Sequence, residues 1–387
     1  MRVTLAIVGI IGMSLPLGRL IATPSSMARS SFLCVTLAAV TMITAGPSAF
    51  AADPSTLSAK QFAASVRKFP KDLGFGYIGA VFFQKVLYVS CNLGLVAVAE
   101  DGSITVYQWS KTDPVIEGPW LDRATPAVWA QRDSDGSLIR FDGKSWRESA
   151  LPEPPRGYTR GDMLTGFAGV STAESFHLIG GKLAWLWKSN EGKWELERKP
   201  PLTGLASVRA FLPLADGNLY LTSEHSSLLD EQPQPGEKAT LFQFHDQWES
   251  HTVEDLGIEQ SVVVDEGAFA RTQDGGVYAI SFKGTAHLNG PGRCEALART
   301  STGGLLASFG SAGVFLRQGE SWESVAASPF SPTEQKHIAH LAEDGGRIAL
   351  VTSPEIEMTS SEKFRHTGTV GIWLSAGGAF RQLKIGE

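Results

Sequence analysis

A short segment centred on tryptophan recurs along this chain and constrains its fold more than any other feature. In the clearest copies Glu or Arg follows the tryptophan; these copies lie at Trp146, Trp194, Trp248 and Trp322. Neighbouring copies, with weaker ones at Trp109 and Phe380, are 37 to 58 residues apart, except for a gap of 74 residues after Trp248. Such a period is typical of repeat architectures, in which each unit buries one face on the next. The wide gap indicates a copy without its tryptophan.

The residues before each tryptophan form short apolar runs separated by glycine turns. In the copy that ends at Trp322, the apolar runs are 296–300, 305–309 and 314–317. Short strands with a turn about every 8 to 12 residues indicate a β-sandwich or a β-propeller. A unit of four strands that repeats favours the propeller, because a sandwich has no reason to repeat four strands at a time.

We therefore predict an all-β fold, a single β-propeller of seven blades, with six or eight blades as alternatives. The expected blades span 75–111, 112–151, 163–200, 205–254, 260–291, 293–326 and 336–385, within a propeller of residues 75–387. Blade five is the shortest, and we expect it to lack its fourth strand. Residues 52–74 form a short N-terminal extension, in which apolar residues of 58–69 at helical spacing predict a short helix that caps one face.

Residues 1–51 have the pattern of an export signal. Arg29 follows Met27, the apolar run 32–43 is too short to span a bilayer, and Ala49–Ala51 obeys the small-x-small cleavage rule. We expect a periplasmic or secreted protein, cleaved after Ala51, with Met27 as an alternative translation start. The apolar stretch before Met27 is either untranslated or an additional anchor, and no stable membrane span is expected in the mature chain.

Composition narrows the classes of partner. The net charge of −6 provides no basic surface for nucleic acid. Only Cys91 and Cys294 remain after cleavage, and they fall in blades that are not neighbours, so we expect no disulfide between them. We expect a monomer and assign no cofactor.

Four Asp-Gly hairpins accompany the repeat, at 135–138, 216–220, 274–278 and 344–347. They resemble the Asp-x-Gly-x-Leu-Trp hairpin of two-component-regulator propeller repeats, the periplasmic sensor repeats of some bacterial kinases. The resemblance covers roughly residues 75–387, and the motif is loose. It implies a periplasmic propeller. Those kinases continue into a membrane helix and a kinase domain, which this sequence lacks, so we do not expect their signalling role.

Blade geometry predicts where a ligand binds. If the strands of a blade are lettered a to d outward from the axis, the b–c and d–a connections share one face of the ring. We place the Asp-Gly hairpins at a–b turns in most blades, and the long loops 152–162, 223–238 and 353–367 on the b–c/d–a face. Long loops on a rigid scaffold concentrate binding residues. The candidate ligand-binding residues are His225, Asp230, Glu231, Glu355, Glu357, Arg365 and His366.

Several other residues that could form a catalytic, metal or sugar site fit a structural role better. Asp265 and Glu266 are expected to open strand a of blade five, where successive side chains point to opposite faces. His337 and His340 would pair on a metal only in a helix. Trp185 and Trp187 are expected in the core rather than on a sugar platform, and 133–136 as a turn rather than a calcium loop. No catalytic or metal-binding residue is assigned.

These observations leave three hypotheses for function. The first is an exported, non-enzymatic propeller that binds a protein or carbohydrate on its loops. The second is a polysaccharide hydrolase or lyase that uses the channel mouth, which needs two carboxylates about 5 to 10 Å apart. The third is a lectin, which needs exposed tryptophan on the loop face.

The mature protein should begin at or near Ala52, because Ala49–Ala51 supplies the cleavage site. Mass spectrometry of protein recovered from the periplasm or medium should find this N-terminus. Exported protein that retains residues before Ser48 would contradict the prediction.

Overall fold

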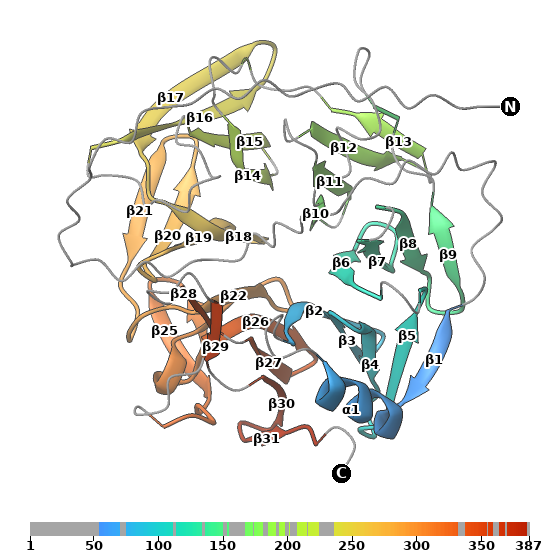
Figure 1. Cartoon of the computed structure of the whole chain (residues 1–387). Helices are drawn as coiled ribbons and strands as arrows, with labels where there is room; N and C mark the ends of the chain where they lie inside the picture. The colour runs from blue at the N-terminus through green and yellow to red at the C-terminus, as the bar shows by residue number, and fades with distance from the viewer. Residues whose placement is uncertain are drawn as a thin grey trace, which may run out of the picture.

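A computed structural model describes residues 54–384, apart from 70–74, 111–113, 134–135, 150–152, 155–166, 173, 181–184, 191–192, 198–200, 202–206, 215, 224–235, 332–336, 354, 359–363 and 368–369. The signal region 1–51 lies outside the described residues. In the described part, antiparallel sheets stand around a central axis as the seven blades of a propeller (Figure 1). The predicted all-β, seven-bladed fold is confirmed.

The strands follow the chain from the axis outward in every blade. Blades one to four contain β2 (Tyr77–Phe83), β3 (Val86–Cys91), β4 (Gly94–Val98) and β5 (Ile104–Gln108); β6 (Ile116–Asp122), β7 (Ala127–Arg132), β8 (Leu138–Phe141) and β9 (Trp146–Ser149); β10 (Phe167–Ser171), β11 (Phe176–Gly180), β12 (Trp185–Asn190) and β13 (Lys193–Leu196); β14 (Ser207–Leu214), β15 (Gly217–Ser223), β16 (Lys238–Phe244) and β17 (Trp248–Glu254).

Blades five to seven continue the same order. They contain β18 (Ile258–Val264), β19 (Gly267–Thr272), β20 (Val277–Ser281) and β21 (Gly284–Leu288); β22 (Ala296–Arg299), β23 (Leu305–Ser308), the 3-10 turn Gly310–Ala312, β24 (Val314–Gln318) and β25 (Ser321–Ala326); β26 (His337–Asp344), β27 (Arg347–Ser353), β30 (Gly371–Ala376) and β31 (Phe380–Gln382). Between β27 and β30, β28 (Glu355–Met358) and β29 (Phe364–Thr367) form a separate two-stranded sheet.

Two predictions about the blades were wrong. Blade five has its fourth strand, β21, which pairs with β20 from Val277 to Ser281 although it carries no tryptophan. The Asp-Gly hairpins divide equally between a–b turns, before Gly217 and Gly345, and b–c turns, before Gly136 and Gly275. Backbone pairing defines a strand whatever its side chains, and a glycine with positive φ suits either kind of turn.

The repeated tryptophans are structural, as predicted. Each lies at or next to the start of an outermost strand and packs with aromatic residues of its own or the preceding blade. Trp146 contacts Tyr107 of blade one, with ring centroids 5.4 Å apart, and Trp194 contacts Trp129 of blade two at 5.3 Å. The repeat therefore marks the joints between blades.

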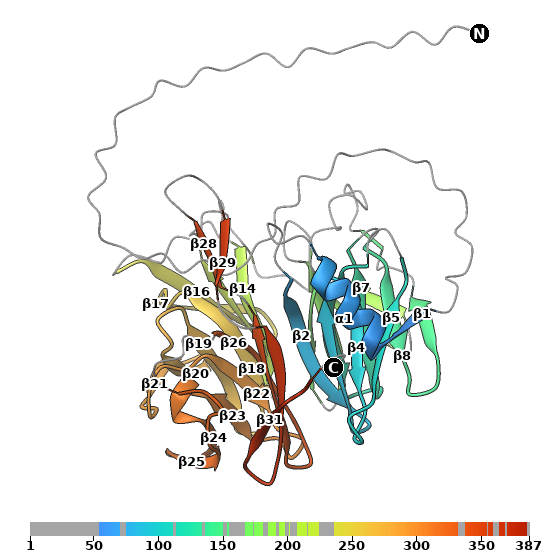
Figure 2. The ribbon, with the colours of Figure 1, turned by 60° about the horizontal axis from the view of Figure 1, so that its bottom comes forward.

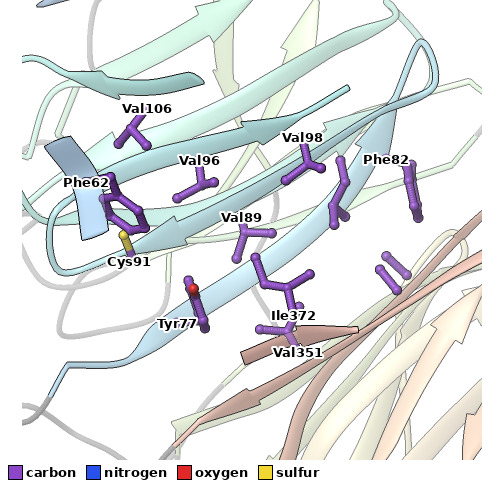
Figure 3. Packing of buried hydrophobic residues seen from close by; sticks show 13 residues of the cluster. Phe62, Tyr77, Phe82, Val89, Cys91, Val96, Val98, Val106, Val351 and Ile372 are labelled. Atoms are coloured by element: carbon purple, nitrogen blue, oxygen red, sulfur yellow. The ribbon is translucent and has the colours of Figure 1, made fainter. Parts of the chain in front are cut away.

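Blades one and seven close the ring without sharing a strand. All four strands of blade seven come from the C-terminal part of the chain, and β1 (Ser55–Ser58) instead adds to the outer edge of blade one beside β5. The closure is a hydrophobic cluster that joins the two blades, here called the closing cluster (Figure 3). Its buried members are Phe62, Tyr77, Phe82, Leu87, Val89, Cys91, Val96, Val98, Val106, Ala342, Ala349, Val351 and Ile372.

The short helix α1 (Ala59–Lys68) packs into this closing cluster. Ser58 begins it with a capping box, in which the Gln61 amide oxygen accepts from the Ser58 backbone N–H at 2.9 Å. Phe62 on its inner side is fully buried. β1 and α1 occupy the segment assigned to an N-terminal extension, so part of that segment belongs to blade one. Within the described residues, no helix is long and apolar enough to cross a bilayer.

Cys91 and Cys294 are both buried and both unpaired, as predicted. Cys91 lies in β3, inside the closing cluster, and Cys294 lies just before β22. Cys91 and Cys294 form no crosslink, so non-covalent contacts between blades one and seven close the ring.

Replacing Phe62 by Ala should lower the free energy of unfolding by about 3–5 kcal/mol, because it leaves a cavity where the ring closes. Lys60→Ala on the exposed side of the same helix is the matched control and should unfold like the parent. Urea unfolding followed by tryptophan fluorescence measures both. Equal stability of the two variants would show that α1 does not contribute to closure.

Candidate functional site

The b–c and d–a connections of all blades lie at one end of the ring, here called the loop face. Three long connections meet this face: 150–166 between β9 and β10, 224–237 between β15 and β16, and the segment that contains β28 and β29 between β27 and β30. The side view shows β28 and β29 standing clear of the ring (Figure 2). The strand order thus places the three long loops on one face.

Two of these loops are tied at their roots by a serine hydroxyl at the end of strand b. Ser223, the last residue of β15, donates a hydrogen bond from its hydroxyl to Asp255, in the connection to blade five. Ser353, the last residue of β27, donates from its hydroxyl to the Tyr77 carbonyl of blade one at 2.7 Å. Both loops therefore depart from fixed points, which limits the directions that they can take.

The Tyr77 carbonyl is a junction on the loop face. Besides the Ser353 hydroxyl it accepts a hydrogen bond from the His340 ring, in β26. Burial, and secondly the charge of His337, lower the pKa of His340 to about 4, so its imidazole is neutral at pH 7. His337 and His340 lie in a strand, not in a helix, as the sequence indicated.

The candidate ligand-binding residues divide into two groups. Glu355 and Glu357 lie in β28, Arg365 and His366 lie in β29, and Glu357 is the backbone register partner of Arg365. The hairpin therefore brings these four positions together. His225, Asp230 and Glu231 lie outside the described residues, so their assignment stays a prediction.

Sequence reasoning missed a hollow on the same face, between blades five and six. Its volume is about 130 Å³, and it is lined by Gly275, Gly276, Val277, His287, Leu288, Asn289, Gly290, Gly292 and Phe309. Pockets that enclose a drug-sized ligand are typically about 300–1,000 Å³. The hollow fits a protruding side chain better than a whole small molecule. Only its two glycine-rich stretches, 275–276 and 290–292, could have suggested it.

Glu117 is a carboxyl group on the loop face with a raised pKa. Glu117, in β6, is half-buried, and burial together with the neighbouring charge of Asp133 raises its pKa. Asp133 is exposed and begins the b–c turn of blade two. Trp187 is buried in the core, as expected, and the side chain of Trp185 lies outside the described residues.

The expectation that Asp265 and Glu266 open strand a was wrong. They form the a–b turn between β18 and β19, at the opposite end of the ring, because strand a extends further towards the N-terminus than its apolar residues indicated. Each carboxylate has an arginine partner: Asp265 lies 2.5 Å from Arg299, and Glu266 lies 2.9 Å from Arg317. Among the described residues, no group of three or more His, Cys, Asp or Glu is placed to hold a metal.

The opposite end, here called the turn face, is bonded from blade to blade. Arg347 donates to the Lys85 carbonyl at 2.6 Å, and the Ser301 backbone N–H donates to the Glu343 carboxylate at 2.6 Å. The Asp265 backbone N–H donates to the Gly303 carbonyl at 2.9 Å. The turns on the turn face are short. The two faces therefore differ in their connections: those of the turn face are short, and those of the loop face carry the insertions.

The chain is thus a seven-bladed β-propeller with its insertions on one face. No family model and no curated protein matches its sequence. Among solved structures it is similar to YCF48 bound to a D1 peptide (10% identity, TM-score 0.49, 78% of this chain and 93% of that chain). It is also similar to the β-propeller domain of the Trilobed protease from Pyrococcus furiosus, which has an open velcro topology (10%, 0.49, 80% and 98%).

A third similar structure is the extracellular domain of the hybrid two-component system BT4673 from B. thetaiotaomicron (11% identity, TM-score 0.45). It belongs to the type of protein that the Asp-Gly hairpins resemble. The match covers 80% of this chain and 45% of that one. At these identities the likeness concerns the fold alone.

Acid should destabilise the protein partly through His340. Its pKa is about 4 in the folded state, against about 6.5 when unfolded, so only the unfolded state gains a proton as the pH falls below 6.5. The stability present above pH 6.5 is therefore lost between about pH 6.5 and 4. By pH 5 the loss should be about 1–2 kcal/mol.

His340→Gln keeps an N–H donor for Tyr77 and does not titrate. Urea unfolding at pH 7.5 and pH 5.0 should show a smaller loss of stability in this variant than in the parent. The exposed His245→Gln is the control and should follow the parent. An identical loss in all three proteins would exclude His340 as a source of acid sensitivity.

Proposed function

We propose that this chain is an exported, non-enzymatic propeller that binds a partner protein with its loop face. The observation that supports this most is the shared anchoring of two long b–c loops. Ser223 and Ser353, at equivalent ends of strand b, each fix a loop root by a hydrogen bond, Ser223 to the connection between blades four and five and Ser353 to blade one. A rigid ring that presents insertions from fixed points is a common arrangement for recognition.

A protein fits this face better than a small ligand. The hollow between blades five and six holds one side chain, and the β28–β29 hairpin stands above the ring (Figure 2). Together they offer a raised hairpin and a depression, which match the uneven surface of a partner protein. In this proposal the hairpin residues Glu355, Glu357, Arg365 and His366 contact the partner, with His225, Asp230 and Glu231 of the blade-four loop.

The location that we propose is the periplasm or the cell exterior. The pattern of residues 1–51 supports export. The burial of Cys91 and Cys294 is compatible with an oxidising compartment, because neither thiol is accessible for exchange.

The proposal is tested by photo-crosslinking in the native envelope. A benzophenone amino acid replaces Glu357, in β28 on the loop face, or Glu100, an exposed residue of the c–d turn of blade one on the turn face. A discrete protein adduct is expected from the first variant and not from the second. Adducts from both, or only from Glu100, would contradict the assignment of the face.

Shortening the loops should remove the partner without unfolding the ring. Residues 225–236 and 355–367 are each replaced by a short glycine-containing turn, and the benzophenone is moved to Asn289 at the hollow. The melting temperature should stay near that of the parent, since surface loops affect stability weakly, while the adduct disappears. Persistence of the adduct in the double deletion would show that the loops do not bind.

A polysaccharide hydrolase is the second candidate, and Glu117 is the observation that favours it. A carboxyl group with a raised pKa beside a second carboxylate, here Asp133, is the pattern of a general acid with its partner. Incubation of the mature chain with a panel of polysaccharides tests this, with Glu117→Gln as the matched variant. Reducing ends released by the parent and not by the variant would favour the enzyme.

A further inference from the structure

Three charged residues meet where the innermost strands end on the turn face. Arg123 directly follows β6 of blade two, Asp265 directly follows β18 of blade five, and Arg299 is the last residue of β22 in blade six. The axial view shows β6 across the centre of the ring from β18 and β22 (Figure 1). The ends of these three strands therefore bring the residues to the turn face near the axis of the ring, on opposite sides of it.

Arg299 and Asp265 form a fixed pair on one side of the axis. The guanidinium nitrogen and the carboxylate oxygen are 2.5 Å apart, and Arg299 also donates to the Val263 carbonyl at 3.4 Å. The Arg299 side chain is 16% exposed, whereas that of Asp265 is 66% exposed. The pair is thus held by its arginine and open to solvent at its carboxylate.

Arg123 lies on the other side of the axis, and its guanidinium has no ion-pair partner among the described carboxylates. Its backbone N–H donates to the Ser171 hydroxyl at 2.8 Å, which fixes the turn. The adjacent Asp122 carboxylate instead accepts from the Thr125 backbone N–H at 2.8 Å and faces Trp129.

Electrostatics agree with this placement. Burial, and secondly the positive charge of Arg299, lower the pKa of Arg123 to about 10, while Asp265 acts in the opposite direction. Both members of the pair therefore act on Arg123 from across the axis of the ring. The cluster contains two cations and one anion, and a half-buried cation without a partner is unfavourable.

We propose that Arg123 and Arg299 bind a small oxyanion, a carboxylate or a phosphate, on the turn face near the axis of the ring. Guanidinium groups present paired N–H donors that match the oxygens of such anions. A bound oxyanion balances the excess positive charge, and the exposure of Asp265 leaves the position open to solvent. This site lies at the end of the ring opposite the loop face and does not depend on the proposed function.

Isothermal titration of the mature chain at low ionic strength tests the site, with inorganic phosphate and N-acetylglutamate amide as probes. The first stands for a free anion and the second for an acidic side chain of a peptide. Arg123→Gln should weaken binding of the preferred probe by about tenfold or more, because one charged pair of hydrogen bonds is lost. Asp265→Asn should tighten binding, since it removes the competing carboxylate and frees Arg299.

Arg317→Gln is the matched control. Arg317 lies in blade six and pairs with Glu266 on the same face, so the variant changes net charge by the same amount outside the cluster. Its affinity for the probe should stay within about twofold of the parent, because Arg317 pairs with Glu266 rather than with a member of the cluster. Melting curves confirm that each variant folds. The proposal is overturned if neither probe binds the parent, if Arg317→Gln weakens binding as much as Arg123→Gln, or if Asp265→Asn weakens it.

Discussion

The packing of blade one against blade seven is the contact on which the other features depend, because no strand is shared across it. Tyr77 shows how the joint is built. Its side chain is buried in the closing cluster, and its carbonyl accepts hydrogen bonds from Ser353 and His340 of blade seven. Hydrophobic burial supplies the attraction, and the polar contacts set the register of the two blades. Helix α1 adds Phe62 to the same cluster.

The same joint orients the candidate binding face. Ser353 is both a donor to the closing blade and the root of the β28–β29 insertion, so the hairpin starts where the ring is closed. The turn face carries short turns instead, and backbone and side-chain hydrogen bonds link the turns of neighbouring blades there. A ring whose turns are linked in this way can carry long insertions on the loop face without loss of its geometry.

Much of the fold could be predicted from local patterns. The tryptophan period marked the joints between blades, because a large aromatic side chain is needed at equivalent positions of each repeat. The pairing register of the strands could not be predicted from these patterns. The innermost strands β2, β6, β14, β18 and β26 each contain a register shift. The residues at these shifts have nothing in common: Ile78, Gly118–Pro119, Arg209, Glu259 and Ala339. Residue type therefore does not mark the position of these bulges.

The sequence by itself determined the strand class and the position of the long loops within their blades, and it favoured seven blades over six or eight, since each depends on periodicity and turn residues over a few tens of residues. It also placed Glu357 and Arg365 in one insertion. Only the tertiary structure decided which distant groups meet. Arg123 and Arg299 are separated by 176 positions and approach one another only because closing the ring turns the ends of β6 and β22 towards a common axis. No local pattern encodes a contact made by the closure of the whole ring.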